Sequence, residues 1–291
     1  MTQDEYFYKK MYYIREFETN LLKLFDEGIL SGTTHAYIGQ EADAVGIIEN
    51  LNNEDHIFSN HRCHGHYLAL TGDGFGLLTE IMGKKSGITR GIGGSQHIGT
   101  MNFKTNGIQG GILPAAAGIA FAYKLKREIG KISAVFIGDG TFGEGIVYET
   151  LNIASLWKLP LLIVVENNYW AQSTPHNLNL AGNIDARLLS FDIPTVHLTT
   201  TDVKIIYENS KKEINILRNI GGPRAIVIDT YRFCAHSKND DARPKEEIEA
   251  RKIYDPLLIQ GKRLNSERKM EIELSVKKEI ENIIQKARNE V

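Results

Sequence analysis

The sequence predicts an α/β protein in which a mainly parallel sheet carries helices on both faces. Short apolar runs rich in Val and Ile, typical of buried parallel strands, alternate with segments whose apolar residues recur every three or four positions. Parallel strands need a crossover connection, usually a helix, so this alternation favours βαβ units. We expect one α/β domain over residues 1–291, with an N-terminal helical segment at about 1–30 and C-terminal helices at about 245–291.

Composition and charge argue against several classes of protein. A formal net charge of −2 and a pI near 6.5 indicate no polyanion-binding surface, and hence no nucleic-acid partner. Two cysteines provide no disulfide framework, and the first ten residues lack an apolar signal segment. The longest weakly polar run, 112–123, is shorter than the about 20 apolar residues that span a bilayer. We therefore expect a soluble, cytoplasmic protein that binds no membrane.

Periodicity places the individual elements. The first helix shows Phe7, Met11 and Ile14 at spacings of three and four, and Gly28 ends it. Similar patterns predict further helices beginning at 39, over 75–82, 114–125, 202–218 and 246–252, and over 271–287. Apolar runs predict strands at 55–58, 132–137, 161–165, 196–198 and 225–228. The stripe of the last helix suits a core or subunit contact, since its polar face is mixed in sign.

The stretch from 132 to 170 reads as strand, glycine turn, helix, strand and polar turn. Gly138-Asp139-Gly140 ends the first strand, and Glu166-Asn167-Asn168 closes the second. Thr141, with Glu144 three residues later, predicts a capping box at the start of the helix. That helix runs to Trp157, and the residues expected to face inward are Ile146, Val147, Leu151, Ala154 and Leu156. Two parallel strands joined by a helix form a βαβ unit, whose ligands bind at the carboxyl ends of the strands.

Those strand ends offer ligands for a metal and a phosphate. Asp139 and Asn168 each follow a strand, and neighbouring strands would bring them together. A carboxylate and an amide oxygen suit Mg²⁺, which completes its shell with phosphate and water. Gly140 lets the backbone approach closely, and the amides of Gly140 and Thr141 open a helix, where phosphates bind. The residues predict a Mg²⁺–diphosphate site; an ordinary βα turn, rich in Gly and Asp, is the alternative.

A second polar cluster follows the strand at 55–58. His61, Arg62, His64 and His66 fall within six residues, which packing alone does not readily explain. Arg presents a planar donor fork to phosphate, and His suits proton transfer near neutral pH. A zinc site and a solvated loop are the alternatives, although the spacing matches no familiar structural zinc motif.

The GDG turn, followed after this interval by NN, resembles the thiamine diphosphate fingerprint. The surrounding EGxxxETLNIAxLWKLP and ENN are similar to the α subunit of the 2-oxo acid dehydrogenases. This family is the first component of the pyruvate, branched-chain 2-oxo acid and acetoin dehydrogenase complexes. The resemblance extends over about 12–256 and implies a thiamine diphosphate-binding fold with thiamine diphosphate and Mg²⁺ as cofactors.

The resemblance also implies roles for single residues. Asp139, Asn168 and the backbone carbonyl of Trp170 would hold the metal, although the family usually has Tyr at the last position. His61 and Arg62 would contact the diphosphate.

Further positions would serve the rest of the cofactor and the reacting atoms. Gly107 and Gln109 would offer groups to the aminopyrimidine ring, Gln109 through its backbone or its side chain. His64 would lie beside the reacting carbon, and His236 would be a second catalytic histidine; a solvated loop histidine is the alternative for His236. The GQEA segment is interpreted as structural; the alternative is that His35 or Gln40 lines the site.

The activity implied is that of an oxidoreductase that cleaves a 2-oxo acid or acetoin and passes the acyl or aldehyde unit to a lipoyl arm. In this family a β subunit supplies the Glu that activates the cofactor, so an α2β2 heterotetramer and a lipoyl-bearing acyltransferase are the expected partners. A transketolase-like half-enzyme, a biosynthetic acyltransferase and a non-enzymatic subunit are the alternatives. The segments HRCHGH and TYRFCAHS argue against the first of these.

Overall fold

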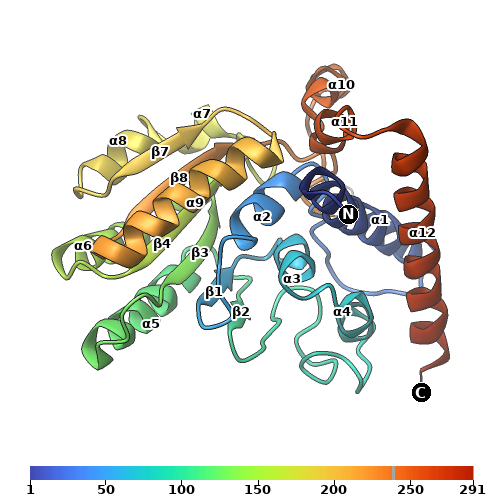
Figure 1. Cartoon of the computed structure of the whole chain (residues 1–291), viewed down its shortest axis with the longest axis horizontal. Helices are drawn as coiled ribbons and strands as arrows, with labels where there is room; N and C mark the ends of the chain where they lie inside the picture. Colours follow the sequence, from blue (N-terminus) through green and yellow to red (C-terminus); the bar gives the residue numbers. More distant parts are fainter. Residues whose placement is uncertain (238–239, 291) are drawn as a thin grey trace.

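The computed structural model describes residues 1–237 and 240–290, and its centre is a six-stranded sheet in which every pairing is parallel (Figure 1). Its strands, in the order in which they lie across the sheet, are β2 (Phe103–Thr105), β1 (His56–Ser59), β3 (Ser133–Gly138), β4 (Leu161–Asn167), β8 (Arg224–Asp229) and β7 (Thr195–Leu198). A separate two-stranded hairpin joins β5 (Trp170–Ala171) and β6 (Thr174–Pro175). The predicted parallel α/β architecture is confirmed.

Helices account for most of the remaining chain. They are α1 (Gln3–Asp26), α2 (Glu41–Ile48), α3 (His64–Thr71), α4 (Gly74–Ile81), α5 (Ile112–Lys126), η1 (Asp139–Gly143), α6 (Gly145–Leu156), α7 (His176–Asn179), α8 (Ile184–Leu189), α9 (Val203–Ile220), α10 (Lys245–Arg251), η2 (Lys252–Tyr254), α11 (Pro256–Gly261) and α12 (Ser266–Asn289). Over the ranges that the structure describes, no helix combines the length and the apolar character that a membrane crossing requires.

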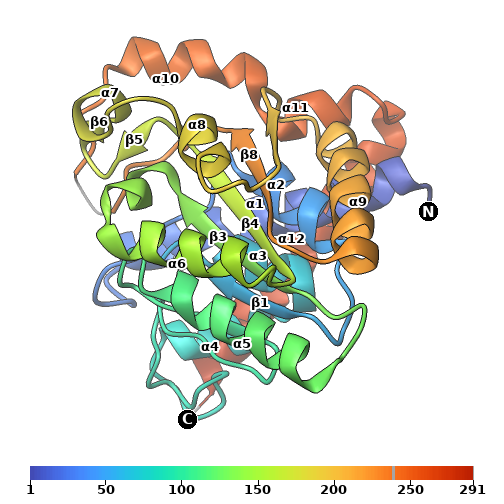
Figure 2. The ribbon, with the colours of Figure 1, turned by 90° about the vertical axis from the view of Figure 1, so that its left-hand side faces the viewer.

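The sheet has a hydrophobic core on each face because successive side chains of a strand point to opposite sides. In β4, Leu162 and Val164 join the core that contains α1, α2, α9 and α12. Leu161, Ile163 and Val165 join the core beneath α5, α6 and α8. Figures 1 and 2 show these two groups of helices on opposite faces of the sheet. The continuous apolar run of β4 is therefore the consequence of burial on both faces.

The two ends of the chain pack together beside the sheet. Helix α1 lies along α12, and α4 packs against α12 (Figure 1). Met11 and Ile14 of α1 share one core with Val276 and Ile280 of α12. The apolar stripe of the last helix is thus a core contact within this chain.

The capping box predicted at Thr141 is wrong. The chain after β3 forms the short 3₁₀ helix η1, and α6 begins only at Gly145, after Glu144. Glu144 has an extended backbone (φ −90°, ψ 132°), so no α-helix can run through it, and its side chain forms no capping bond. The Thr141 hydroxyl instead donates a hydrogen bond to Gln109 Oε1 at 3.2 Å.

The inward face predicted for the following helix is correct only in part. Val147, Leu151 and Ala154 are fully buried. Ile146 is 36% exposed and Leu156 is 71% exposed, so both were assigned to the wrong face. The buried residues recur at spacings of four and three. Ile146 lies one position before Val147, and Leu156 lies two positions after Ala154, so both side chains turn away from the core.

Candidate functional site

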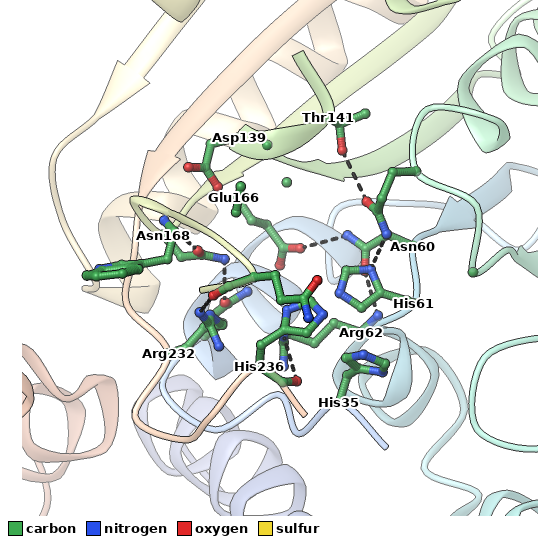
Figure 3. A pocket seen from close by; sticks show the side chains of 18 of the residues that line it. His35, Asn60, His61, Arg62, Asp139, Thr141, Glu166, Asn168, Arg232 and His236 are labelled. Atoms are coloured by element: carbon green, nitrogen blue, oxygen red, sulfur yellow. Dashed lines mark hydrogen bonds between the residues drawn. The ribbon is translucent and has the colours of Figure 1, made fainter. Parts of the chain in front are cut away.

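A cavity of about 380 Å³ lies at the carboxyl ends of the central strands, where a parallel sheet is expected to bind its ligand (Figure 3). All the predicted site residues except His64 line it: His61, Arg62, Gly107, Gln109, Asp139, Gly140, Thr141, Asn168, Trp170 and His236. His35, Gln40 and Arg232 join them. Segments about 200 residues apart in the sequence, such as those that carry His35 and His236, therefore meet in one place.

The two oxygen ligands predicted for a metal lie at adjacent strand ends. Gly138 pairs with Glu166 in the register of β3 and β4, so Asp139 and Asn168 emerge at the same edge of the sheet. The Asp139 carboxylate is buried and hydrogen-bonded to Nδ1 of His176 at 3.0 Å. The Asn168 amide donates to Gln40 Oε1 at 3.3 Å, and its oxygen accepts from the Trp170 backbone N–H at 3.2 Å. These oxygens are the hard donors that Mg²⁺ prefers.

Gly140 is required by a close backbone contact. A Cβ at this position would lie 2.8 Å from Ala171 Cβ and 3.3 Å from Ala171 Cα. The 3₁₀ turn after β3 thus lies directly against β5, and only glycine leaves room for both segments.

Two buried arginines, Arg62 and Arg232, line the cavity and bring positive charge to it. Arg62 donates to the Ala36 carbonyl at 2.6 Å, and Arg232 donates to the Gln172 carbonyl at 2.9 Å. Burial lowers the pKa of Arg62 to about 10 and that of Arg232 to about 9, so both remain cations near neutral pH. Arg232 Nε is buried without a hydrogen-bond partner in the part of the chain that the structure describes. This arrangement suits an anionic ligand such as a diphosphate.

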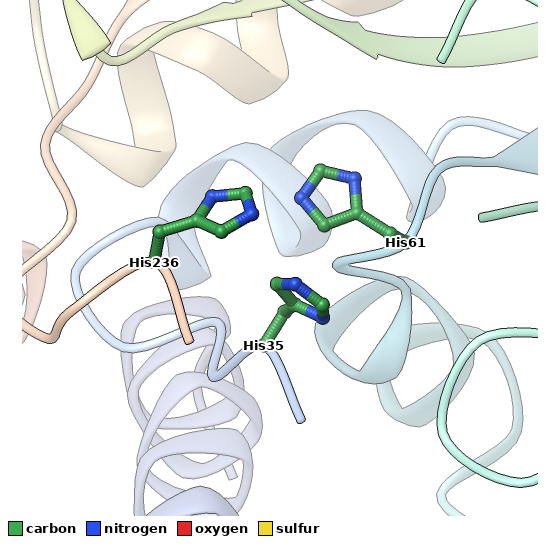
Figure 4. Close-up of side chains that lie close together, drawn as sticks. All are labelled: His35, His61 and His236. Carbon is green, nitrogen blue, oxygen red and sulfur yellow. The ribbon is translucent and has the colours of Figure 1, made fainter. Parts of the chain in front are cut away.

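Three histidines face the cavity as neutral groups. The ring of His35 lies 4.5 Å from that of His61 and 4.6 Å from that of His236, centroid to centroid (Figure 4). Burial, followed by the charge of Arg62, lowers the pKa of His35 to about 3 and that of His236 to about 4. The same causes hold the pKa of His61 well below its usual range. A neutral imidazole offers one N–H donor and one lone-pair acceptor at pH 7.

His64 does not line the cavity, and its place beside the reacting carbon stays a prediction. Its ring is fully buried, and Nδ1 is 3.2 Å from Glu18 Oε1. Its Nε2 is 3.0 Å from Ser95 Oγ and 3.1 Å from the Ser95 carbonyl. Since α3 begins at His64, this side chain turns toward α1 while His61, three residues earlier, turns into the cavity.

A buried network behind the cavity explains His66, for which the sequence suggested no role. Glu166 lines the cavity and accepts a hydrogen bond from the Tyr37 hydroxyl. Its carboxylate also lies 3.2 Å from His66 Nε2, and His66 Nδ1 lies 2.8 Å from Ser59 Oγ. Burial by itself would raise the pKa of Glu166, but His66 and Tyr37 outweigh it and lower that pKa. The network fixes the strand ends that carry Asn60 and Asn168.

Sequence reasoning missed Arg232 and Glu166 as cavity residues. Glu166 is the second-last residue of β4, and Arg232 follows the end of β8 by three residues. Ligands of a parallel sheet bind at the carboxyl ends of its strands. Applying this rule to every strand, and not only to those before Asp139 and Asn168, would have identified both residues.

Comparison with known proteins gives one consistent family. The model of the dehydrogenase E1 component family matches residues 9–291. The chain is 38% identical over 237 residues to the α subunit of acetoin:2,6-dichlorophenolindophenol oxidoreductase of Bacillus subtilis, covering 80% of this chain and 71% of that protein. It is 37% identical over 259 residues to the pyruvate dehydrogenase E1 component subunit alpha of Zymomonas mobilis, covering 86% and 73%. The testis-specific mitochondrial form of that subunit from Rattus norvegicus is 33% identical over 290 residues, covering 96% and 74%.

Proposed function

This chain belongs to the dehydrogenase E1 component family, and on that premise we propose that it is the α subunit of a thiamine diphosphate-dependent dehydrogenase acting on a 2-oxo acid or on acetoin. The observation that carries the proposal is one cavity that combines hard oxygen ligands, Asp139 and Asn168, with two buried cations, Arg62 and Arg232. A metal-bound diphosphate needs both kinds of group.

The cavity residues suit the parts of this cofactor. Asp139, Asn168 and the Trp170 carbonyl would hold Mg²⁺, which prefers oxygen ligands and retains phosphate and water. Arg62 and Arg232 would bind the diphosphate, together with His61. Gly140 and Thr141, whose amides are proposed to bind phosphate, line the same cavity as Gly107 and Gln109, which are proposed to serve the aminopyrimidine ring.

When bound, thiamine diphosphate supplies the electron sink that lets a 2-oxo acid lose carbon dioxide or lets acetoin be cleaved. The protein's part is to bind and to orient the reacting groups. His35 and His236 are neutral at pH 7, so each ring can donate one hydrogen bond and accept another beside the reacting atoms. His64 is a positioning residue in this scheme, since it holds Ser95 without reaching the cavity.

The partner proposed is a β subunit in an α2β2 heterotetramer that serves a lipoyl-bearing acyltransferase. The names of the relatives designate them as α subunits. Helix α6 exposes an apolar stripe formed by Ile146, Ile153 and Leu156, and Trp157, which follows the helix, is exposed as well. A stripe of this kind beside an open cavity suits a partner that would complete the site. We also propose a cytoplasmic location, in keeping with the two free cysteines, Cys63 and Cys234.

Native mass spectrometry of the protein, purified together with whatever accompanies it, tests this function. We expect two copies of this chain with two of a partner, carrying thiamine diphosphate and Mg²⁺. The Asp139→Ala variant should keep the assembly but lose the cofactor mass, because one oxygen ligand is removed. The control is Asp26→Ala, at the exposed end of α1.

Two results would count against the proposal. A homodimer that retains the cofactor would mean that this chain forms a complete site and would favour a transketolase-like enzyme. Full cofactor retention in Asp139→Ala would remove the metal assignment.

A further inference from the structure

The hairpin that carries Trp170 is held by a carboxylate from a helix far along the chain. Oε1 of Glu247, in α10, accepts two hydrogen bonds: one from the Trp170 indole N–H at 3.1 Å and one from the Tyr231 hydroxyl at 2.7 Å. Figure 2 shows α10 along the top of the molecule, beside β5 and β6. One oxygen of α10 therefore joins the hairpin to the segment that follows β8.

The backbone of this hairpin needs support from outside. Strands β5 and β6 pair over two residues each, and so short a ribbon is not stable by itself. Tyr169 and Gln172, which flank β5, have φ angles of 66° and 56°. Residues other than glycine adopt this left-handed region only at an energetic cost, which the surrounding structure must offset. The position of Trp170 is thus set by contacts with the rest of the fold.

Two of these contacts act on the hairpin backbone from inside the cavity (Figure 3). The Asn168 side-chain oxygen accepts from the Trp170 N–H at 3.2 Å, and Arg232 donates to the Gln172 carbonyl at 2.9 Å. Both groups are proposed to serve the cofactor, so neither is reserved for the hairpin. The bond from the indole ring to Glu247 is different, since Glu247 does not line the cavity. It can hold the hairpin whatever the cavity contains.

Core packing does not explain where α10 lies. None of its residues is buried. The Arg251 guanidinium lies 5.5 Å from the ring centroids of both Tyr169 and Tyr231, within the range of a cation–π contact. Burial and the hydrogen bond to Glu247 raise the pKa of Tyr231 to about 12, so its hydroxyl stays protonated as a donor near neutral pH. The helix is therefore attached to the hairpin through polar and aromatic contacts, of which the Glu247 carboxylate makes two.

We propose that Glu247 is a positioning residue for the metal of the cofactor: it fixes the hairpin through the Trp170 indole and so keeps the Trp170 backbone carbonyl in place as a ligand. This role rests on the proposed function, in which that carbonyl holds Mg²⁺ together with Asp139 and Asn168. Glu247 would itself touch neither the ion nor the diphosphate. Partners that orient a metal ligand in this way commonly change metal affinity by about 10- to 100-fold.

The two hydrogen bonds indicate which property of Glu247 matters. Both donors bond to the same oxygen, and a carbonyl oxygen has two lone pairs, so the amide oxygen of glutamine can accept both bonds. Leucine has a similar size and suits a helix, but it offers no acceptor. The role therefore depends on an acceptor oxygen and not on the negative charge.

Calorimetry of Mg²⁺ binding in the presence of thiamine diphosphate, on the full protein with its copurifying partner, tests this role. Glu247→Leu should weaken Mg²⁺ binding by about tenfold or more, whereas Glu247→Gln should bind as the wild type does. The matched control is Glu246→Leu, at the exposed neighbour of Glu247 in α10, which should also equal the wild type.

Amide hydrogen exchange of the assembly without Mg²⁺ and cofactor supplies a readout that needs no loaded site. Residues 169–176 should exchange faster in Glu247→Leu than in the wild type, and Glu247→Gln should keep the slow exchange. Mg²⁺ binding unchanged in Glu247→Leu, or weakened equally in Glu247→Gln, would overturn the role. Faster exchange throughout the chain in Glu247→Leu would also overturn it, because Glu247 would then support the fold as a whole.

Failure of the proposed function would give a different result. If the wild type binds no thiamine diphosphate, the function itself is removed, and Glu247 has no metal ligand to position. If the wild type and all three variants bind the cofactor and Mg²⁺ equally, the function stands and only the role of Glu247 is lost.

Discussion

Gly140 shows how one residue sets the shape of the cavity. It lies in the 3₁₀ turn after β3, between Asp139, the proposed metal ligand, and Thr141, and packs against Ala171 of β5. The missing side chain lets β5 and the turn approach each other, and this approach brings Trp170 to the same wall of the cavity as Asp139.

The Gly140→Ala variant should lose cofactor affinity and about 1–3 kcal/mol of stability, because a Cβ would lie 2.8 Å from Ala171 Cβ. The measurements are thermal unfolding and thiamine diphosphate binding by calorimetry. Gly143→Ala is the matched control, since a Cβ there meets no atom within 4 Å. Adding Ala171→Gly to Gly140→Ala should restore part of the loss; no recovery in the double variant would show that the steric account is incorrect.

At the scale of the element, α6 has two faces with different purposes. Val147, Leu151 and Ala154 pack into the core beneath the sheet, whereas Ile153, Leu156 and the other exposed apolar residues cover none of it. Apolar surface of this extent on a helix next to the cavity is costly unless a partner covers it. We therefore assign this face to the proposed β subunit.

The Leu156→Glu variant should separate the partner from this chain without unfolding it. Leu156 is 71% exposed, so a charge is tolerated in the free chain, but an uncompensated charge buried in an interface costs about 3 kcal/mol or more. Sedimentation of the copurified assembly measures the effect. Leu274→Glu on α12, at a leucine that is 61% exposed, should leave the assembly intact. If Leu156→Glu also sediments as the intact assembly, the interface lies elsewhere.

At the scale of the whole molecule, buried histidines make stability depend on pH. The pKa of His35 is lowered to about 3 in the folded chain, against 6.5 for a free histidine. The unfolded chain therefore binds more protons below about pH 6.5, and the free energy of unfolding falls as the pH drops, by at most about 1.4 kcal/mol per pH unit. The stability lost in acid by the wild type should be smaller in His35→Gln, as measured by melting temperature from about pH 7 to about pH 5.

His197 should change the pH dependence of stability in the opposite direction, because its pKa is raised in the folded chain. Although partial burial lowers its pKa, hydrogen bonds to Asp185 and Asp229 at 2.7 and 3.0 Å raise it overall. Its stabilising effect is complete below the unfolded pKa near 6.5 and is lost as the pH rises through the raised value. His197→Gln should therefore be less stable than the wild type in acid and equal to it in alkaline solution. Parallel pH profiles for both variants would contradict the assigned shifts.

Local patterns were enough to predict the framework. The apolar runs of β3 and β4 and the helix between them identify neighbouring parallel strands, and the residues after each strand then share one edge. Asp139, Gly140 and Asn168 follow from this rule, because the carboxyl ends of adjacent parallel strands must lie together. The three-residue strand β2 escaped prediction, since so short a segment has no detectable period.

The sequence by itself determined the α/β class, the family and the oxygen-lined edge of the sheet, because each depends on residues close together in the chain. The resemblance seen in the sequence already pointed to His61 and His236 as site residues. Only the tertiary structure placed His35 beside them and turned His64 toward Glu18. It also brought Arg232 beside Arg62. The physical reason is that such contacts join segments as far as about 200 residues apart, and their meeting depends on how helices and sheet pack, which no local pattern records.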